Sequence, residues 1–214
     1  MQISDMRDLA DDPVAQKVAW EPLVPGGTNF CTHTLKSITP KRMQFKATMG
    51  ALLFGWAFFL AGLGTMGLSI WSKVDGTYST STEFPFWVVA LVATVFLGFG
   101  CLMLWSLTQP IVFDKGTGVF RRGFSSPSRQ QARGRNDCAP LEDIHALQIV
   151  TEVIKTVGEG RSKTYSSYEL NLVLNDASRI NVVDHGNQTQ MMQDSDSLAK
   201  FLNVPLWRDS DYKN

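Results

Sequence analysis

Two long uncharged stretches, residues 47–71 and 84–108, constrain the fold of this chain more than any other feature. Each is 25 residues long and contains no Asp, Glu, Lys or Arg. As helices they would be about 37 Å long at about 1.5 Å per residue, and about 20 apolar residues are enough to cross the hydrocarbon core of a bilayer. The pattern therefore predicts two transmembrane helices joined by a short turn. The alternative is a pair of buried helices in a soluble core.

Small residues recur along the first stretch with the spacing of one helix face. Ala47, Ala51 and Gly55 are four residues apart, and Ala57 and Ala61 repeat that spacing. Rows of small residues allow the backbones of two membrane helices to approach closely. We therefore expect these five residues to pack the first span against the second.

Basic residues gather at the outer ends of the predicted hairpin and not in its turn. The turn between the spans carries Lys73, which Asp75 and Glu83 offset. The basic residues that flank the two spans are Lys36, Lys41, Arg42, Lys46, Lys115, Arg121 and Arg122. Because cytoplasmic segments are enriched in Lys and Arg, this bias predicts that both termini are cytoplasmic. The membrane would be a bacterial inner (cytoplasmic) membrane or a thylakoid-like membrane.

The rest of the chain predicts a polar N-terminal tail and a β-rich domain interrupted by the hairpin. Residues 1–28 are acidic and then rich in Pro and Gly, residues 29–46 form a β-hairpin before the membrane, and residues 109–214 form a cytoplasmic β domain. Alternating or apolar runs predict strands at 29–35, 43–47, 110–113, 118–124, 141–157, 168–174 and 179–183, and helical periodicity predicts a helix at 188–202. Residues 124–140 read as a polar loop.

This inventory of elements predicts the fold class. Residues 29–46 and 109–214 lie on the same side of the predicted membrane hairpin, so they can complete one domain. Seven strands followed by a C-terminal helix are typical of a pleckstrin-homology-like domain. We therefore expect an α+β membrane protein in which a two-helix hairpin, residues 47–108, carries a β-barrel or sheet domain closed by the C-terminal helix.

A run of arginines after the second span is the strongest local charge feature. Five arginines precede the first acidic residue, Asp137, in this segment: Arg121, Arg122, Arg129, Arg133 and Arg135. Basic clusters beside a membrane attract anionic lipid headgroups or acidic partners. The alternative is a solvated loop that only enforces topology.

Catalytic, metal and nucleic-acid signatures are absent from the sequence. It contains no P-loop, GxSxG, HExxH or dinucleotide-binding motif. Cys31 and His33 alternate as half of a metal site would, but two further ligands are not apparent. The three cysteines, Cys31, Cys101 and Cys138, have no paired spacing, which favours free thiols. We therefore expect no catalytic residues, no bound metal, no cofactor and no nucleic-acid partner.

Three segments of the chain resemble the photosystem I assembly protein family that chloroplasts encode as hypothetical reading frame 4. The segments are 113–124 (FDKGTGVFRRGF), 140–145 (PLEDIH) and 198–206 (LAKFLNVPL). The resemblance extends over the twin spans and most of the C-terminal domain. It implies a non-enzymatic, membrane-anchored assembly factor, or a bacterial relative of the same architecture that serves another complex.

Together these features predict a non-enzymatic membrane scaffold or assembly factor that binds other proteins of a membrane complex through its cytoplasmic domain. The alternative function is a module that senses anionic lipid or another ligand through the arginine-rich loop, residues 121–135.

Overall fold

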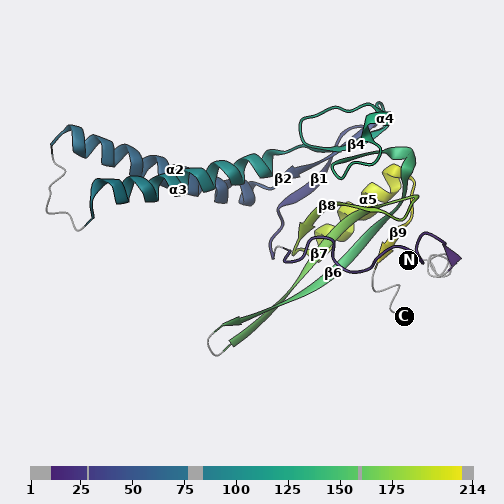
Figure 1. Cartoon of the computed structure of the whole chain (residues 1–214). Helices are drawn as coiled ribbons and strands as arrows, with labels where there is room; N and C mark the ends of the chain where they lie inside the picture. Colours follow the sequence, from purple (N-terminus) through teal and green to yellow (C-terminus); the bar gives the residue numbers. More distant parts are fainter. Residues whose placement is uncertain (1–10, 28, 77–83, 159–160, 209–214) are drawn as a thin grey trace. The chain divides into compact units, whose positions relative to one another are not determined.

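The computed structural model describes residues 11–27, 29–76, 84–158 and 161–208. The chain divides into two compact units (Figure 1). One unit is a helical hairpin, Ala47–Gln109, and the other combines Met1–Lys46 with Pro110–Asn214. We call the second unit the β unit. The hairpin is thus inserted in sequence between two parts of a single folded unit.

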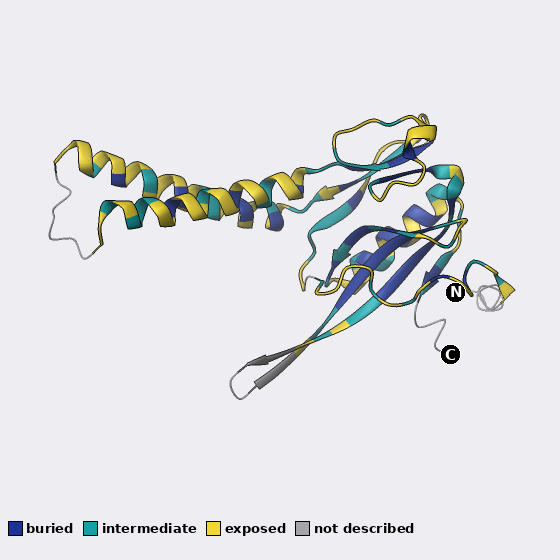
Figure 2. Ribbon diagram, in the orientation of Figure 1, coloured by how far each residue is buried: buried dark blue, intermediate teal, exposed yellow. Residues whose placement is uncertain are grey.

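The hairpin consists of α2 (Met49–Val74) and α3 (Phe86–Thr108), in agreement with the two predicted spans. Thr48 begins α2 because its side chain accepts a hydrogen bond from the Ala51 backbone amide at 3.3 Å. Both helices are long and apolar enough to cross a membrane. Only 17% and 11% of the residues in their most apolar stretches are buried, and Figure 2 shows exposed residues along both helices. This exposure differs from that of a soluble core helix.

Small side chains bring α2 and α3 into contact. The buried residues recur mostly seven apart: Ala51, Gly55, Gly62 and Ser69 on α2, and Ala93, Gly100 and Leu107 on α3. A seven-residue repeat is typical of left-handed helix pairing. A Cβ atom on Gly62 would lie 2.6 Å from the Leu97 nitrogen, and one on Gly100 would lie 2.5 Å from the Phe59 nitrogen. The two backbones therefore touch at these glycines.

The first sheet of the β unit joins strands from both sides of the hairpin. It contains β1 (His33–Thr39), β2 (Arg42–Ala47), β3 (Ile111–Asp114), β4 (Val119–Arg122) and β5 (Cys138–Pro140), in that spatial order. The two strands that flank the hairpin, β2 and β3, pair antiparallel with Phe45 opposite Ile111. The segment predicted as a polar loop contains α4 (Arg129–Ala132), which begins with a capping box formed by Ser128 and Gln131.

The second sheet has the order β8-β7-β6-β9. Its strands are β6 (Ile144–Gly158), β7 (Arg161–Leu174), β8 (Arg179–His185) and β9 (Leu206–Arg208), and β9 runs parallel to β6. A 3-10 turn, η1 (Leu141–Asp143), precedes β6. Helix α5 (Gln188–Leu202) has the predicted bounds and ends at Asn203, whose backbone is left-handed (φ 62°).

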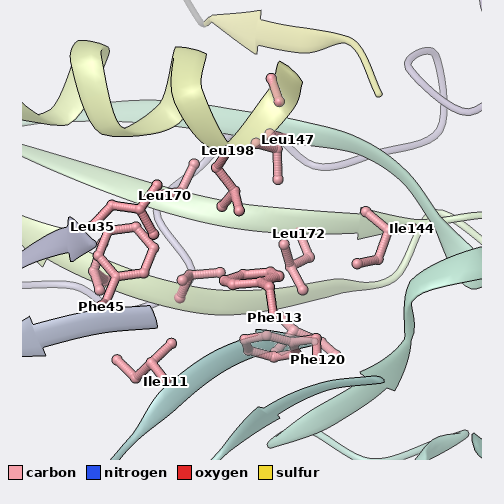
Figure 3. Packing of buried hydrophobic residues seen from close by; sticks show 14 of the residues in the cluster. Leu35, Phe45, Ile111, Phe113, Phe120, Ile144, Leu147, Leu170, Leu172 and Leu198 are labelled. Carbon is pink, nitrogen blue, oxygen red and sulfur yellow. The ribbon is translucent and has the colours of Figure 1, made fainter. Parts of the chain in front are cut away.

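The main core lies between the two sheets and α5 (Figure 3). Phe113 and Phe120 from the first sheet pack ring to ring with centroids 4.7 Å apart, and neither is exposed. Leu147 and Leu172 contribute from the second sheet, and Leu198 contributes from α5. Full burial of each such side chain stabilises the fold by about 1.5–3 kcal/mol.

The predicted barrel does not close. The described strands form two separate sheets, and they number nine where the sequence predicted seven. Pro140 ends β5, and η1 then redirects the chain into β6, so the two strands are not continuous. The extra strands β5 and β9 are three residues long each, which is too short for an alternating pattern to reveal.

Candidate functional site

Arg122, one of the five predicted lipid-binding arginines, joins the two sheets. It lies half-buried on β4, and its Nη2 donates to the backbone carbonyl of Val182 and, at 3.1 Å, to that of Asn181 on β8. Burial lowers the pKa of Arg122, while nearby Asp184 opposes that shift. The carbonyls accept hydrogen bonds from Nη2 of this half-buried guanidinium, which indicates a structural role for Arg122.

Arg121 and Arg129 also bind backbone carbonyls. Arg121 donates to the carbonyl of Gly123, and Arg129 Nε donates to the carbonyl of Thr117 at 3.1 Å. Burial lowers the pKa of Arg121, and the neighbouring Arg42 adds to the effect.

The remaining arginines pair with carboxylates that follow them in the chain. Arg133 lies 3.0 Å from Glu142 and 3.1 Å from Asp143, and Arg129 reaches Glu142 at 3.6 Å. Arg135 binds Asp137 at 2.7 Å and lowers the pKa of Asp137 to about 2. Exposed pairs of this kind contribute little stability, but they reduce the positive charge that the loop presents. Glu142 and Asp143 follow the arginine run in the sequence, so the charge of the run alone does not reveal that its arginines are paired with carboxylates.

Residues 12–27, which belong to the predicted polar tail, cover the outer face of the second sheet. We call residues 12–27 the strap; Figure 1 shows it in dark purple alongside β6 and β7. Ala15 and Val18 are buried against Ala146 and Val173, which face away from the main core. The Trp20 and Trp207 rings lie 6.5 Å apart in the same cluster. The outer face is therefore buried under the strap.

The side chain of Asp12 connects the beginning of the strap to β6. Its carboxylate accepts hydrogen bonds from the backbone amides of Val14 and Ala15 at 2.8 and 3.2 Å, and it lies 2.7 Å from His145 Nε2 on β6. Burial raises the pKa of Asp12, but the hydrogen bonds from His145 and the two amides outweigh it, so the pKa is lowered overall.

The second half of the strap is held mainly through its backbone. Two carboxylates each accept two consecutive amides: Glu169 binds those of Leu23 and Val24 at 2.9 and 2.8 Å, and Glu152 binds those of Gly26 and Gly27 at 3.0 and 3.3 Å.

Three further side chains donate to strap carbonyls. Gln148 donates to Ala19 at 3.0 Å, Arg179 donates to Glu21 at 2.8 Å, and Tyr165 donates to Gly27 at 3.4 Å. Five sheet side chains thus contact the main chain of the strap from residue 19 to residue 27.

A buried polar row on β7 lies beneath the strap. Ser167, Glu169 and Asn171 alternate along the strand and are 2%, 4% and 0% exposed. The sequence places Glu169 and Asn171 opposite the core-facing leucines, and the structure confirms this alternation. Ser167 Oγ and Asn171 Oδ1 have no hydrogen-bond partner among the described residues. This row therefore places three buried polar side chains next to one another on the face that the strap covers.

Three further titratable residues, Asp194, His185 and Asp184, lie on α5 and at the end of β8. Asp194 on α5 accepts a hydrogen bond from the Leu35 backbone amide at 2.9 Å, and burial raises its pKa. His185 is fully buried, and burial together with neighbouring His33 lowers its pKa to about 4. Beside it, burial raises the pKa of Asp184 to about 6, with Glu169 adding to the shift.

The suspected metal half-site does not gain further ligands in the described residues. Cys31 Sγ lies 3.2 Å from the His33 carbonyl, and the His33 ring contacts Thr32. Within the described ranges, His, Cys, Asp and Glu do not form a group of three that could hold a metal ion. All three cysteines are free thiols.

The structure brings only two of the five residues predicted at the helix contact into that contact. Ala51 and Gly55 are buried in the hairpin, whereas Ala57 and Ala61 are exposed on α2. Ala47 precedes α2 and is half-buried at the end of β2. At Gly62 and Gly100 the backbones of α2 and α3 approach each other most closely. These glycines belong to a seven-residue spacing, whereas the predicted row has a four-residue spacing.

Comparison with protein-family profiles, curated proteins and solved structures finds no match to this chain.

Proposed function

We propose that this protein is a two-span membrane scaffold or assembly factor that binds other proteins through its β unit. The observation that carries the proposal is the insertion of the apolar hairpin between two paired strands. Strand β2 ends at Ala47 and α2 begins at Met49, while α3 ends at Thr108 and β3 begins at Ile111. Since β2 and β3 pair, membrane insertion of the hairpin anchors a folded domain and not a loose tail.

The orientation is part of the proposal. Exposed Lys41 and Lys46 precede α2, Lys115 follows α3, and Lys73 with Asp75 lies at the turn. The positive-inside bias then gives a cytoplasmic β unit. A bacterial inner membrane or a thylakoid-like membrane fits this arrangement.

The β6–β7 ribbon supports a protein-binding role. Beyond Ile149 on β6 and before Tyr168 on β7, the two strands pair with each other and extend past their pairing with β9 and β8. Two-stranded ribbons are marginally stable by themselves and gain stability from packing against another element. Val153, 57% exposed, lies on this ribbon. We propose that a partner protein covers this part of the ribbon.

The resemblance of three segments to photosystem I assembly proteins is consistent with this role. It suggests assembly of a large membrane complex as the process that the scaffold serves. A pleckstrin-homology-like architecture of the β unit belongs to the same proposal.

Co-purification tests the proposal. The tagged full-length chain is solubilised in mild detergent, and bound proteins are identified by mass spectrometry. We expect subunits of one membrane complex in stoichiometric amounts, and we expect Val153→Asp to lose them while Lys200→Ala, an exposed polar site on α5, retains them. A chain that purifies alone, under conditions that keep other membrane complexes intact, contradicts the proposal.

A further inference from the structure

We infer that the outer face of β6, β7 and β8 is a recognition site for a peptide segment of a partner protein in the bent backbone conformation of the strap, and that strap residues 19–27 occupy this site in cis. The inference rests on the proposed protein-binding function and adds a second binding surface to the part of the β6–β7 ribbon that carries Val153. We call this surface the strap groove; it comprises Gln148, Glu152, Tyr165, Ser167, Glu169, Asn171 and Arg179.

The groove contacts the main chain of its occupant. Side chains from three strands bind backbone groups of residues 19, 21, 23, 24, 26 and 27. Each of the carboxylates Glu152 and Glu169 accepts two consecutive amides, and hydrogen bonds to a charged acceptor are stronger than those between neutral groups. Because every polypeptide offers these backbone groups, such contacts do not restrict the groove to one sequence.

The side chains in the middle of the strap confirm that backbone contacts dominate. Leu23 and Val24 are 42% and 46% exposed, although their amides bind the buried carboxylate of Glu169. A segment that only closed a hydrophobic core would bury these apolar side chains. Other residues can therefore replace Leu23 and Val24 in a bound peptide.

Sequence requirements remain at the two ends of the segment. Trp20 lies against Trp207 at the first end. At the second end, Gly26 has a φ of +85°, and a Cβ atom on Gly27 would lie 2.1 Å from Ser167 Oγ. The ligand class is thus a bent peptide segment with a large aromatic residue followed, six residues later, by Gly-Gly.

The strap leaves part of the groove unsatisfied. Ser167 Oγ and Asn171 Oδ1 are buried without a hydrogen-bond partner in the described part of the chain. Burying an unpaired polar group is unfavourable, so a peptide that supplies a hydrogen-bond donor to these oxygens binds more favourably than the strap. When the strap leaves, water can solvate the polar groups, so exchange does not expose a purely apolar surface.

Peptide binding to the full-length chain in detergent tests the inference. The probe is a fluorescein-labelled peptide of residues 11–27, measured by fluorescence anisotropy. The tethered strap competes at a high effective concentration, so the wild-type chain should bind the probe weakly. Gly27→Ala in the chain should loosen the strap and tighten probe binding by at least about tenfold.

Two controls make the result specific. Adding Glu169→Gln to Gly27→Ala should abolish the gain, and a probe peptide that itself carries Gly27→Ala should not bind. Gly26→Ala, which strains the left-handed backbone without a clash, loosens the strap by an independent route if Gly27→Ala impairs folding. Circular dichroism verifies folding of each variant.

The inference is overturned if folded Gly27→Ala and Gly26→Ala chains bind the probe no better than wild type, or if Glu169→Gln leaves their binding unchanged. Co-purification with a membrane complex would then still support the proposed function. Probe binding by a chain that recruits no protein would instead contradict the proposed function alone.

Discussion

Arg122 on β4 donates a hydrogen bond to the backbone carbonyl of Val182 on β8, and thereby connects the two sheets of the β unit. The same guanidinium group also reaches the carbonyl of Asn181 at 3.1 Å. An arginine that the sequence assigns to a lipid-binding loop therefore holds the fold together.

Replacement of Arg122 should destabilise the β unit. Arg122→Met keeps much of the side-chain length but leaves the carbonyls of Val182 and Asn181 without this donor. We expect a loss of about 2 kcal/mol in the free energy of unfolding, measured by chemical denaturation in detergent. Arg133→Met, which removes only exposed ion pairs, should cost less than about 0.5 kcal/mol. Equal losses in the two variants would show that Arg122 does not connect the sheets energetically.

Gly100 should be sensitive to size because its Cα faces the backbone of Phe59. Gly100→Val inserts methyl groups where a Cβ atom would already lie 2.5 Å from the Phe59 nitrogen. Overpacking of this kind costs about 1–3 kcal/mol, so thermal unfolding of the hairpin in detergent should shift to lower temperature. Gly98→Val is the matched control, since nothing lies within 4 Å of its added Cβ atom. If both variants unfold at the same temperature, the seven-residue contact is not the helix interface.

Asp184 and His185 should have opposite effects on stability at acidic pH. The folded pKa of His185, about 4, is below its ordinary value of 6.5, so its contribution is complete above pH 6.5 and is lost as the pH falls towards 4. The folded pKa of Asp184, about 6, is above its ordinary 3.8, so folding gains stability as the pH falls from 6 towards 3.8.

Asp184→Asn removes the opposing titration, so this variant should show the full contribution of His185 to the loss of stability at acidic pH. Between pH 7 and pH 4 we expect this variant to lose about 3 kcal/mol of unfolding free energy, at 1.36 kcal/mol per pKa unit, and wild type to lose less. Denaturation at a series of pH values measures both slopes. Adding His185→Leu should flatten the slope of Asp184→Asn; a slope that persists would assign the acid sensitivity to other groups.

The lipid-sensing alternative predicts a different result for the exposed arginines. Arg129, Arg133 and Arg135 each pair with a nearby carboxylate, which reduces the positive charge available to lipid. Replacing all three arginines by Gln should therefore change the amount of anionic lipid bound to the detergent-purified chain only slightly. Mass spectrometry of retained lipid measures the effect, with Lys17, Lys36 and Lys200 replaced by Gln as a control of equal charge. Selective loss of anionic lipid in the arginine variant would favour the sensing function over the scaffold.

The sequence revealed the local elements of the fold well. Charge-free runs predicted α2 and α3, and helical periodicity predicted α5 from Gln188 to Leu202. Alternation also separated the inner face of β7 from the outer face that carries Glu169. These features depend on residues close together in the chain, which is why they can be read from patterns.

The strap could not be predicted because its contacts span most of the chain. Leu23 and Val24 bind Glu169 across about 145 residues, and the strap segment is rich in Pro and Gly, which looks like an irregular loop. The pairing of Arg133 with Glu142 is unpredictable for a similar reason, because the sequence of a polar loop does not show which acidic residues lie beside it in the fold. Strands β5 and β9 are defined by their pairing with neighbouring strands, and each is too short to show an alternating pattern in the sequence.

Cysteine labelling in intact cells tests the central claim, that the hairpin spans a membrane and holds the β unit in the cytoplasm. Single cysteines at Gly76, beside the turn, and at Lys36 and Lys200, in the β unit, are introduced into a chain whose three native cysteines are replaced by Ser or Ala. We predict that a membrane-impermeant maleimide labels position 76 in intact cells and labels positions 36 and 200 only after the cells are broken. Labelling of positions 36 and 200 from outside, with position 76 protected, would contradict the account.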